Sequence, residues 1–323
     1  MNHEAYRIRQ FAPHDYPEEV EVWTRVDPGR VFTVEERRHF EEKILTPPMV
    51  NFKIVAEERS SGTAVGFGYL QSDLESYDPR SFWANVSVHP EHQRQGVGLA
   101  LAKEIDLEAG RRHARRLWAA VRADDARAVR FLSEQGFVER RRSWRSRLDL
   151  ARVANLPDRT ETLTQQGISF TTLAEEEVDN PEVLRELYDL SVATVADEPR
   201  LGPYTPMTFE QFVEMELRGP SFLPDAYFLA RKGSRFVSSS ALRRAEGEPD
   251  TLQQSFTGTR REFRGRGIAS ELKRRAVEYG RANGYRFIRT GNDSLNQPML
   301  AINRKLGFQR EIERIAAEKQ LGI

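Results

Sequence analysis

The chain carries one pattern twice: a strand-like run, a loop containing glycines, and then an apolar helical repeat. The two loops are QRQGVGLA, from residue 93, and RGRGIASE, from residue 264. Gly96 and Gly267 are 171 residues apart, and so are Gly136 and Gly307, each of which precedes a phenylalanine. Two landmarks that share one offset without a gap indicate an internal duplication. The chain must therefore fold into two copies of one unit.

The residues around the first loop predict a strand, a turn and a helix. The run SFWANVSV at 81–88 alternates apolar with polar residues, which is the period of a strand. Pro90 ends the strand because proline has no N–H to donate. Val97, Leu101 and Ile105 recur at the four-residue spacing of one helix face. We expect a helix over 97–110, a strand over 115–121, a helix over 125–135 and a strand ending near residue 150.

The second copy repeats this order, with a helix over 268–282, a strand over 285–290, a helix over 296–306 and a final strand. An amphipathic helical region and two or three strand-like runs precede each loop. The boundary between the copies falls near residue 155, where Asn155, Pro157 and Asp158 cluster as turn signals. We therefore predict two domains, 1–154 and 155–323.

A glycine loop that opens a helix has a chemical use. The first helical turn leaves backbone N–H groups without partners inside the helix, and the helix dipole adds positive charge at the same end. Glycine lets a phosphate approach this backbone closely, so each loop is a candidate phosphate site. For a single glycine pair, a tight turn without a ligand is the alternative. The loops lack the third glycine of the dinucleotide-binding fingerprint and the Lys-Ser/Thr of a P-loop.

Composition narrows the class of protein. Lys and Arg total 49 and Asp and Glu also total 49, so we expect neither a nucleic acid nor a membrane as partner. The absence of cysteine excludes disulfides, thiolate metal sites and cysteine nucleophiles. The first residues lack the apolar core of a signal peptide, and we expect a soluble, cytoplasmic protein. His89 and His92 have the spacing of a metal pair, but Pro90 interrupts the helix between them, and we expect no metal.

The order strand, Q/R-x-x-G-x-G/A loop, helix, strand and helix ending in GF resembles the GNAT acetyltransferases. The resemblance covers almost the whole chain and looks most like the tandem proteins of the mycothiol synthase type. It implies an α/β (α+β) fold of two GNAT domains, each a mixed, mostly antiparallel twisted sheet with helices on both faces. It also implies acetyl-CoA as co-substrate, lying between the strands beside each glycine loop. The implied acetyl-CoA contacts are Val86, Ser87, Val88, Gln93, Arg94, Gln95, Gly96, Val97, Gly98, Leu99 and Ala100 in copy one, and Thr257, Gly258, Thr259, Arg264, Gly265, Arg266, Gly267, Ile268, Ala269, Ser270 and Asn296 in copy two.

The family chemistry implied by the resemblance is direct attack of an amine on the thioester. It needs a base for the amine and a group that protonates the departing thiolate. The family acid is commonly a tyrosine four residues before the GF glycine, but here that position holds Leu132 in copy one and Asn303 in copy two. Neither can act as that acid, although Asn303 could donate a hydrogen bond to sulfur. Asp197 and Glu198, in the predicted substrate lid, are the candidate bases, unless they only cap or solvate a loop.

We therefore predict an N-acetyltransferase that moves an acetyl group from acetyl-CoA to a primary amine of a small-molecule acceptor. Asn303, and Asn296 at a position where copy one has Asp125, favour copy two as the catalytic half. One alternative is an acyl-CoA-binding sensor or structural protein without transfer activity. Another has both halves active on one polyamine-like acceptor. We expect a monomer whose two copies form an internal pseudo-dimer, or a homodimer.

Overall fold

The computed structural model describes residues 5–29, 32–153, 156–245 and 247–322. The chain forms two compact units. Unit 1 takes its described residues from 1–142, 202–205 and 313–323, and unit 2 takes its own from 143–201 and 206–312. Residues 154 and 155, where the sequence places the domain boundary, lie outside the described residues.

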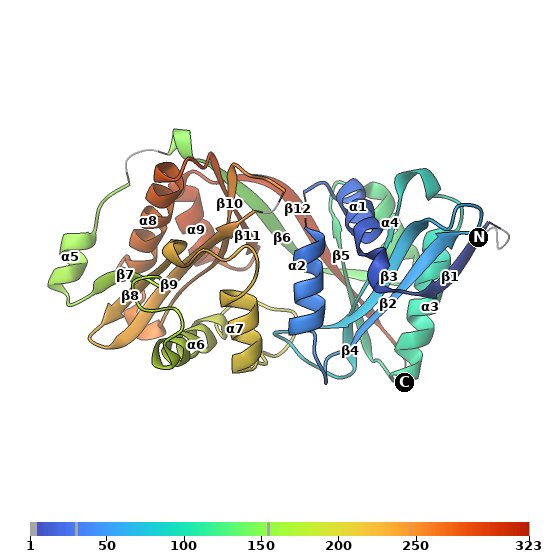
Figure 1. Ribbon diagram of the computed structural model, residues 1–323, viewed down its shortest axis with the longest axis horizontal. Helices are drawn as coiled ribbons and strands as arrows, with labels where there is room; N and C mark the ends of the chain where they lie inside the picture. Colours follow the sequence, from blue (N-terminus) through green and yellow to red (C-terminus); the bar gives the residue numbers. More distant parts are fainter. Residues whose placement is uncertain (1–4, 30–31, 154–155, 246, 323) are drawn as a thin grey trace. The chain divides into compact units, whose positions relative to one another are not determined.

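Unit 1 contains a mixed sheet whose strands lie in the order β1, β2, β3, β4, β5 and β12 (Figure 1). Strands β4 and β5 pair in parallel, and the other neighbours pair antiparallel. The strands are β1 Tyr6–Gln10, β2 Asn51–Glu58, β3 Ala64–Ser72, β4 Ser81–Val88, β5 Arg116–Arg122 and β12 Gln309–Gln320. The helices are α1 Tyr16–Val26, α2 Val34–His39, α3 Val97–Arg111 and α4 Ala126–Glu134.

Unit 2 repeats this arrangement in the strand order β7, β8, β9, β10, β11 and β6. Here β10 and β11 form the parallel pair. The strands are β7 Ser169–Thr172, β8 Tyr227–Lys232, β9 Arg235–Arg244, β10 Thr251–Thr259, β11 Phe287–Asp293 and β6 Val138–Asp149. The helices are α5 Thr160–Gln165, α6 Pro181–Val195, α7 Phe209–Leu217, α8 Ile268–Ala282 and α9 Gln297–Leu306. The predicted fold, two mostly antiparallel GNAT-like sheets with helices, is confirmed.

The last strand of each repeat completes the sheet of the other repeat. Residues 143–149 of β6 pair with β11 in unit 2, and residues 314–320 of β12 pair with β5 in unit 1 (Figure 1). The compact units therefore differ from the predicted domains 1–154 and 155–323. Residues 143–153 belong to unit 2 although they precede the predicted boundary, and residues 313–322 belong to unit 1 although they follow it.

Helices cover both faces of the sheet in unit 1. Successive strand residues point to opposite faces, so neighbouring apolar residues must be buried on both sides. On β2, Ile54 packs in one core cluster with Leu101 and Ile105 of α3. Its neighbour Val55 packs in another cluster with Val22 of α1. The predicted amphipathic helix after the first loop therefore buries its apolar stripe against the sheet.

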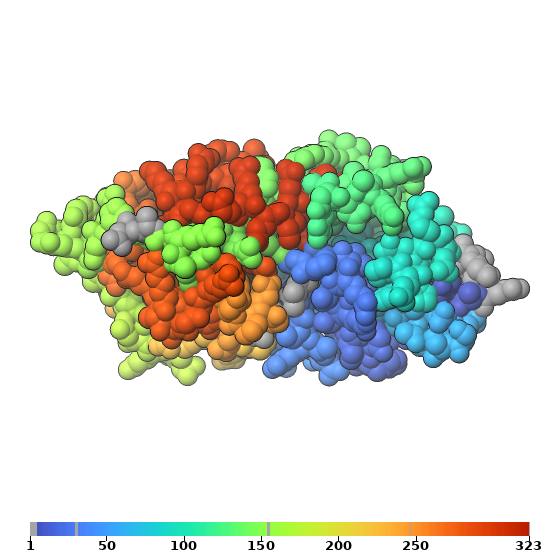
Figure 2. Space-filling model, turned by 90° about the horizontal axis from the view of Figure 1, so that it is seen from above, coloured from blue at the N-terminus to red at the C-terminus, as the bar shows by residue number. Residues whose placement is uncertain are grey.

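Helices cover both faces of the sheet in unit 2 as well. Leu272 of α8 shares a core cluster with Phe228 of β8, whereas Leu187 of α6 shares a different cluster with Leu229. Arg281 near the end of α8 donates hydrogen bonds to the carbonyl oxygens of Leu150 and Val153. The green surface near residue 150 and the orange-red surface of α8 accordingly lie side by side in Figure 2. Of the helices in the described ranges, none has the length and apolar character needed to cross a membrane.

Candidate active site

The parallel strand pair of each unit separates halfway along its length. Strands β4 and β5 pair only at 81–83 and 116–118, although β4 continues to Val88. Strands β10 and β11 likewise pair only at 251–253 and 287–289. The gap beyond each pairing opens beside the glycine loop, where the resemblance places acetyl-CoA.

Both glycine loops have the same backbone conformation. Gly96 and Gly267 cap the starts of α3 and α8 with φ values of +82° and +88°. Two residues earlier, Arg94 and Gly265 also have positive φ values, +63° and +75°. Glycine adopts this left-handed conformation without the steric cost of a side chain, so the loop can turn its N–H groups outward at the helix start.

The side chains that brace the loops are also equivalent. Nε2 of Gln93 donates to the carbonyl oxygen of Val88 at 3.0 Å, and Nε of Arg264 donates to that of Thr259 at 2.8 Å. These pairs are related by the same offset of 171 residues as the glycines. The duplication is therefore preserved in the geometry of the loop as well as in its sequence.

A groove of about 880 Å³ lies at the first glycine loop. Eight predicted acetyl-CoA contacts line it: Val86, Ser87, Val88, Gln93, Arg94, Gly96, Gly98 and Leu99. The remaining three are used differently. Gln95 accepts a hydrogen bond from the Tyr6 hydroxyl, Val97 is buried in the core, and the Ala100 N–H donates inside the helix to Gly96.

Asp125 also lines this groove, but its carboxylate has a local role. Its Oδ1 accepts hydrogen bonds from the backbone N–H groups of Arg127 and Ala128 and so caps α4. Asn296 caps α9 in the same manner, by accepting from the N–H of Met299. The two residues therefore perform one structural task in both copies.

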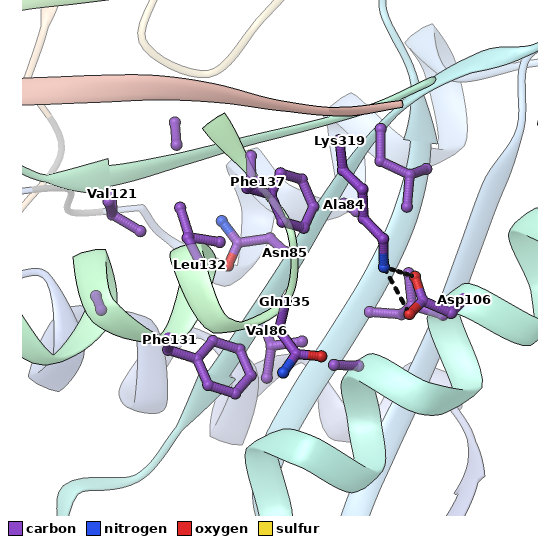
Figure 3. Close-up of a pocket in the computed structure, with 16 residues that line it drawn as sticks. Ala84, Asn85, Val86, Asp106, Val121, Phe131, Leu132, Gln135, Phe137 and Lys319 are labelled. Atoms are coloured by element: carbon purple, nitrogen blue, oxygen red, sulfur yellow. Dashed lines mark hydrogen bonds and ion pairs between the residues drawn. The ribbon is translucent and has the colours of Figure 1, made fainter. Parts of the chain in front are cut away.

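A smaller pocket of about 80 Å³ adjoins the groove in unit 1. The two share Val86, Ala128, Phe131 and Gln135. Figure 3 shows Phe131 and Leu132 of α4 beside this space and Lys319 reaching Asp106. Most of the side chains that line this pocket are apolar, including Ala84, Ala102, Ala119, Val121 and Leu132.

The predicted contacts of the second loop meet a more polar environment. The hydroxyls of Thr257 and Thr259 share hydrogen bonds with Ser240 and Ser238 of β9. A Cβ on Gly258 would lie 2.5 Å from the Phe256 ring and 2.7 Å from Thr194, so only glycine fits there.

The other predicted contacts in copy two lie at the helix start. Ile268 is buried in the core, while Ala269 and Ser270 form the first turn of α8. Arg266 donates to the carbonyl oxygen of Glu262. The exposed side chain of Arg159 lies across Gly267, with Cδ 3.0 Å and Nε 3.4 Å from the place of a Cβ there. A guanidinium thus lies beside the loop that would hold the phosphates.

Asp197 is engaged by arginines of the second loop region. Its two carboxylate oxygens accept hydrogen bonds from Arg261 and Arg264, at 2.5 and 2.6 Å. These arginines hold the pKa of Asp197 below its ordinary value, whereas a general base at neutral pH needs a raised carboxylate pKa. Asp197 is therefore poorly suited to the predicted role. Glu198 is half-buried, and its backbone N–H donates to the carbonyl oxygen of Val195.

Asn303 belongs to a buried polar group that sequence reasoning did not identify. Its Oδ1 accepts from Nζ of Lys273 at 3.0 Å, and its Nδ2 donates to Oδ1 of Asn292. Lys273 is 2% exposed, and burial lowers its pKa from 10.5 to about 7. A comparison of the two copies could have identified this group. Lys273, Asn303 and Asn292 occupy the positions that hold the apolar residues Ala102, Leu132 and Val121 in the first copy.

The strand before the second loop is not regular. A bulge between Gln254 and Phe256 interrupts the register of β10 with β9, and Nε2 of Gln254 bonds the carbonyl oxygens of Ala241 and Phe256 across it. The extra residue, Ser255, interrupts the alternation of side chains between the two faces that a regular strand would give.

His89, Glu91 and His92 have potential ligand atoms that all lie within 4.8 Å of one another. Nδ1 of His92 is 3.0 Å from the Tyr6 hydroxyl oxygen, so that nitrogen is engaged in a hydrogen bond. The three side chains are half-buried or exposed beside the first loop.

Comparison with known proteins agrees with this geometry. The model of the acetyltransferase (GNAT) family matches residues 16–137 and 191–308. The chain belongs to this family, as a tandem acyltransferase with two GNAT units, and the family uses acetyl-CoA.

Among individual proteins, the chain is 28% identical over 243 residues to a mycothiol acetyltransferase of Thermobifida fusca, a match that covers 70% of this chain and 71% of that protein. A solved GCN5-related N-acetyltransferase from Sphaerobacter thermophilus superposes with a TM-score of 0.71 at 19% identity and covers 98% of this chain and 97% of that one. A tandem GNAT protein from the clavulanic acid biosynthesis pathway gives 0.72 at 18%, with 98% and 99% covered. These two likenesses show the fold alone.

Proposed function

We propose that unit 2 transfers the acetyl group of acetyl-CoA to a primary amine of a small-molecule acceptor by direct attack. The observation that carries this proposal is the contrast between equivalent positions beside the two strand gaps. Unit 1 presents Ala102, Val121 and Leu132 there, whereas unit 2 presents hydrogen-bonding groups. At these three positions a thiolate that departs in unit 1 would meet carbon, and one that departs in unit 2 would meet donors.

Unit 1 then holds acetyl-CoA without turning it over. Its groove and its loop conformation support binding, but Leu132 offers no hydrogen bond to sulfur. In unit 2, Arg159 adds a positive charge at the phosphate end of the proposed site. The guanidinium fork suits a pyrophosphate through paired hydrogen bonds.

Glu198 is the remaining carboxylate candidate for the base of unit 2, since Arg261 and Arg264 already bind the carboxylate of Asp197. The acceptor is proposed only as a class. The mycothiol acetyltransferase of Thermobifida fusca is too distant, at 28% identity, for its substrate to be transferred to this chain.

The experiment is a calorimetric titration of acetyl-CoA into Gly98→Trp, Ala269→Trp and the unaltered protein. These positions are equivalent, and both lie in the first helical turn, where a side chain needs no left-handed backbone. A Cβ on Gly98 would have only ordinary contacts, 3.7 Å from Val88 and 3.9 Å from Phe131, so the indole enters the groove. Tryptophan at Gly96 or Gly267 would instead strain a positive φ.

We expect two bound equivalents, each removed by its own substitution. Release of CoA with a panel of primary amines should stop only with Ala269→Trp. If Gly98→Trp alone stopped it, the assignment of catalysis to unit 2 would be wrong. Partial loss with either variant would favour two active sites. Binding without release for any amine would favour the alternative of an acyl-CoA sensor.

A further inference from the structure

Lys273 is a buried cation without a described counter-ion. Its hydrogen-bond partner among the described residues is the neutral amide of Asn303, and the ring of Phe308 lies 5.5 Å from its nitrogen. Within the described part of the chain, burial is the cause of its lowered pKa. Burying a cation without a counter-ion is costly, and groups with strongly shifted pKa values cluster at functional sites.

The duplication indicates what this cation faces. Its counterpart Ala102 lines the small pocket of unit 1, together with Val121 and Leu132, the counterparts of Asn292 and Asn303. That pocket shares four lining residues with the groove at the glycine loop. A ligand whose pyrophosphate is held at the loop would extend its arm toward this pocket. The equivalent position in unit 2 would receive the sulfur end of CoA.

Lys273 also fixes the orientation of Asn303. An ammonium group can only donate hydrogen bonds, so the oxygen of the Asn303 amide must face it. The amide nitrogen must then face away from Lys273, where one of its hydrogens bonds Asn292. The second hydrogen has no partner among the residues that the structure describes. It is the donor that a sulfur atom in the strand gap would meet.

We infer that Lys273 is a positioning residue of unit 2, whose charge and hydrogen bond make the amide of Asn303 a stabiliser of the CoA thiolate that leaves during transfer. This inference rests on the proposed function. During the step, the acceptor nitrogen forms a bond to the acetyl carbon and the C–S bond breaks, with its electron pair remaining on sulfur. The proton lost by nitrogen passes to the base or to solvent, and solvent later protonates the thiolate. The thiolate that forms beside Lys273 favours the charged form of its amine, so Lys273 keeps its proton while the thiolate is bound.

The test measures the thiol of bound CoA and needs no acceptor. Free CoA is bound to the Gly98→Trp protein, so that only unit 2 is occupied, and the ultraviolet absorbance of the thiolate is followed as the pH rises. An opposite charge nearby typically lowers a pKa by about 1 to 3 units, and we expect the thiol pKa of bound CoA to fall by an amount in this range. The Ala269→Trp protein gives the unit 1 signal for subtraction if Gly98→Trp folds poorly.

Two substitutions separate charge from orientation. Lys273→Gln keeps a donor for Asn303 but removes the charge, and Lys273→Met removes both. Lys305→Met makes the same chemical change at an exposed site of α9 and serves as the control. We expect the thiol pKa to return to its value in water with Gln and with Met, and to stay lowered in the control. Turnover should fall at least about tenfold in kcat with both, with little change in KM.

A lowered thiol pKa that survived in Lys273→Gln would overturn the inference, because orientation alone would then suffice. An unshifted thiol in the parent protein would overturn it as well. Failure of the proposed function looks different. If no amine is acetylated while the bound thiol still titrates low and depends on Lys273, the proposed function fails, and with it the role of Lys273 in transfer, while its effect on the thiol of bound CoA stands. If calorimetry finds no CoA in unit 2, both fail.

Discussion

Replacement of Lys273 by methionine should stabilise the protein while it impairs catalysis. The pKa of Lys273 is about 7 when folded and 10.5 as its ordinary value, a difference that corresponds to a folding cost on the order of 4 to 5 kcal/mol near neutral pH. Methionine fills a similar volume without a charge. The loss of the donor to Asn303 costs about 1 to 3 kcal/mol. The net expectation is a gain of about 2 kcal/mol, or roughly 4 to 8 °C in the melting temperature of unit 2.

The sign of the pH dependence follows from proton binding. Between pH 7 and 10.5 the unfolded chain holds a proton on Lys273 that the folded chain has lost, so wild-type stability from this group rises with pH. The advantage of Lys273→Met should therefore be largest at or below about pH 7 and shrink by up to about 1.4 kcal/mol per unit above it. Calorimetric melting at several pH values measures this difference. A variant that is less stable than wild type by a constant amount at every pH would refute the argument.

Lys53 in unit 1 provides a matched control for this substitution. It is also a buried lysine, but its Nζ lies 2.7 Å from Glu19 and 3.0 Å from Glu41, and Arg37 completes the cluster. Removing one partner of such a cluster leaves a carboxylate buried without full compensation. Lys53→Met should therefore destabilise the protein by about 3 to 5 kcal/mol, opposite in sign to Lys273→Met. Equal effects at the two sites would show that burial, not pairing, decides the outcome.

Further substitutions test the second loop. Arg159→Ala should weaken acetyl-CoA binding several-fold in the Gly98→Trp protein and leave it unchanged in the Ala269→Trp protein. Calorimetric titration measures both affinities. Equal weakening in the two proteins would exclude a local role of Arg159 at the second loop. Asp197→Asn should leave most of the turnover and keep the acidic limb of the pH–rate profile, because Asp197 is already ionised and paired. A loss of turnover of a hundredfold or more would restore Asp197 as the base.

The sequence predicted the local parts of the fold well. The helix expected over 97–110 is found as α3, 97–111, and the one expected over 268–282 has those bounds. These elements depend on glycine conformation and on the spacing of apolar residues within a few turns, which the sequence states directly. The loop conformation at Gly96 and Gly267 follows from the same local rules.

The exchange of β6 and β12 could not be predicted in this way. The two strands come from equivalent positions of the duplication, and either could pair with the free edge of β5 or of β11 by its pattern alone. The choice depends on contacts between residues far apart in the chain. The bulge at Gln254 has the same origin, since a side chain that bonds two carbonyl groups across it supports the extra residue.

The two copies differ in where each places a lysine beside the position of the small pocket. In unit 1, Lys319 reaches the small pocket, but Asp106 accepts two hydrogen bonds from it at 2.8 and 2.9 Å, so the charge is neutralised. The equivalent positions in unit 2 are Leu148 and Val277, both buried and apolar. Unit 2 instead carries Lys273, which faces an amide. Charge neutralised by a carboxylate contributes little to an incoming anion, whereas a cation held against a neutral donor keeps its field. Among the described residues, the same sheet, loop and helix thus give unit 2 a cation without a carboxylate partner, beside the position where we propose that the thiolate forms.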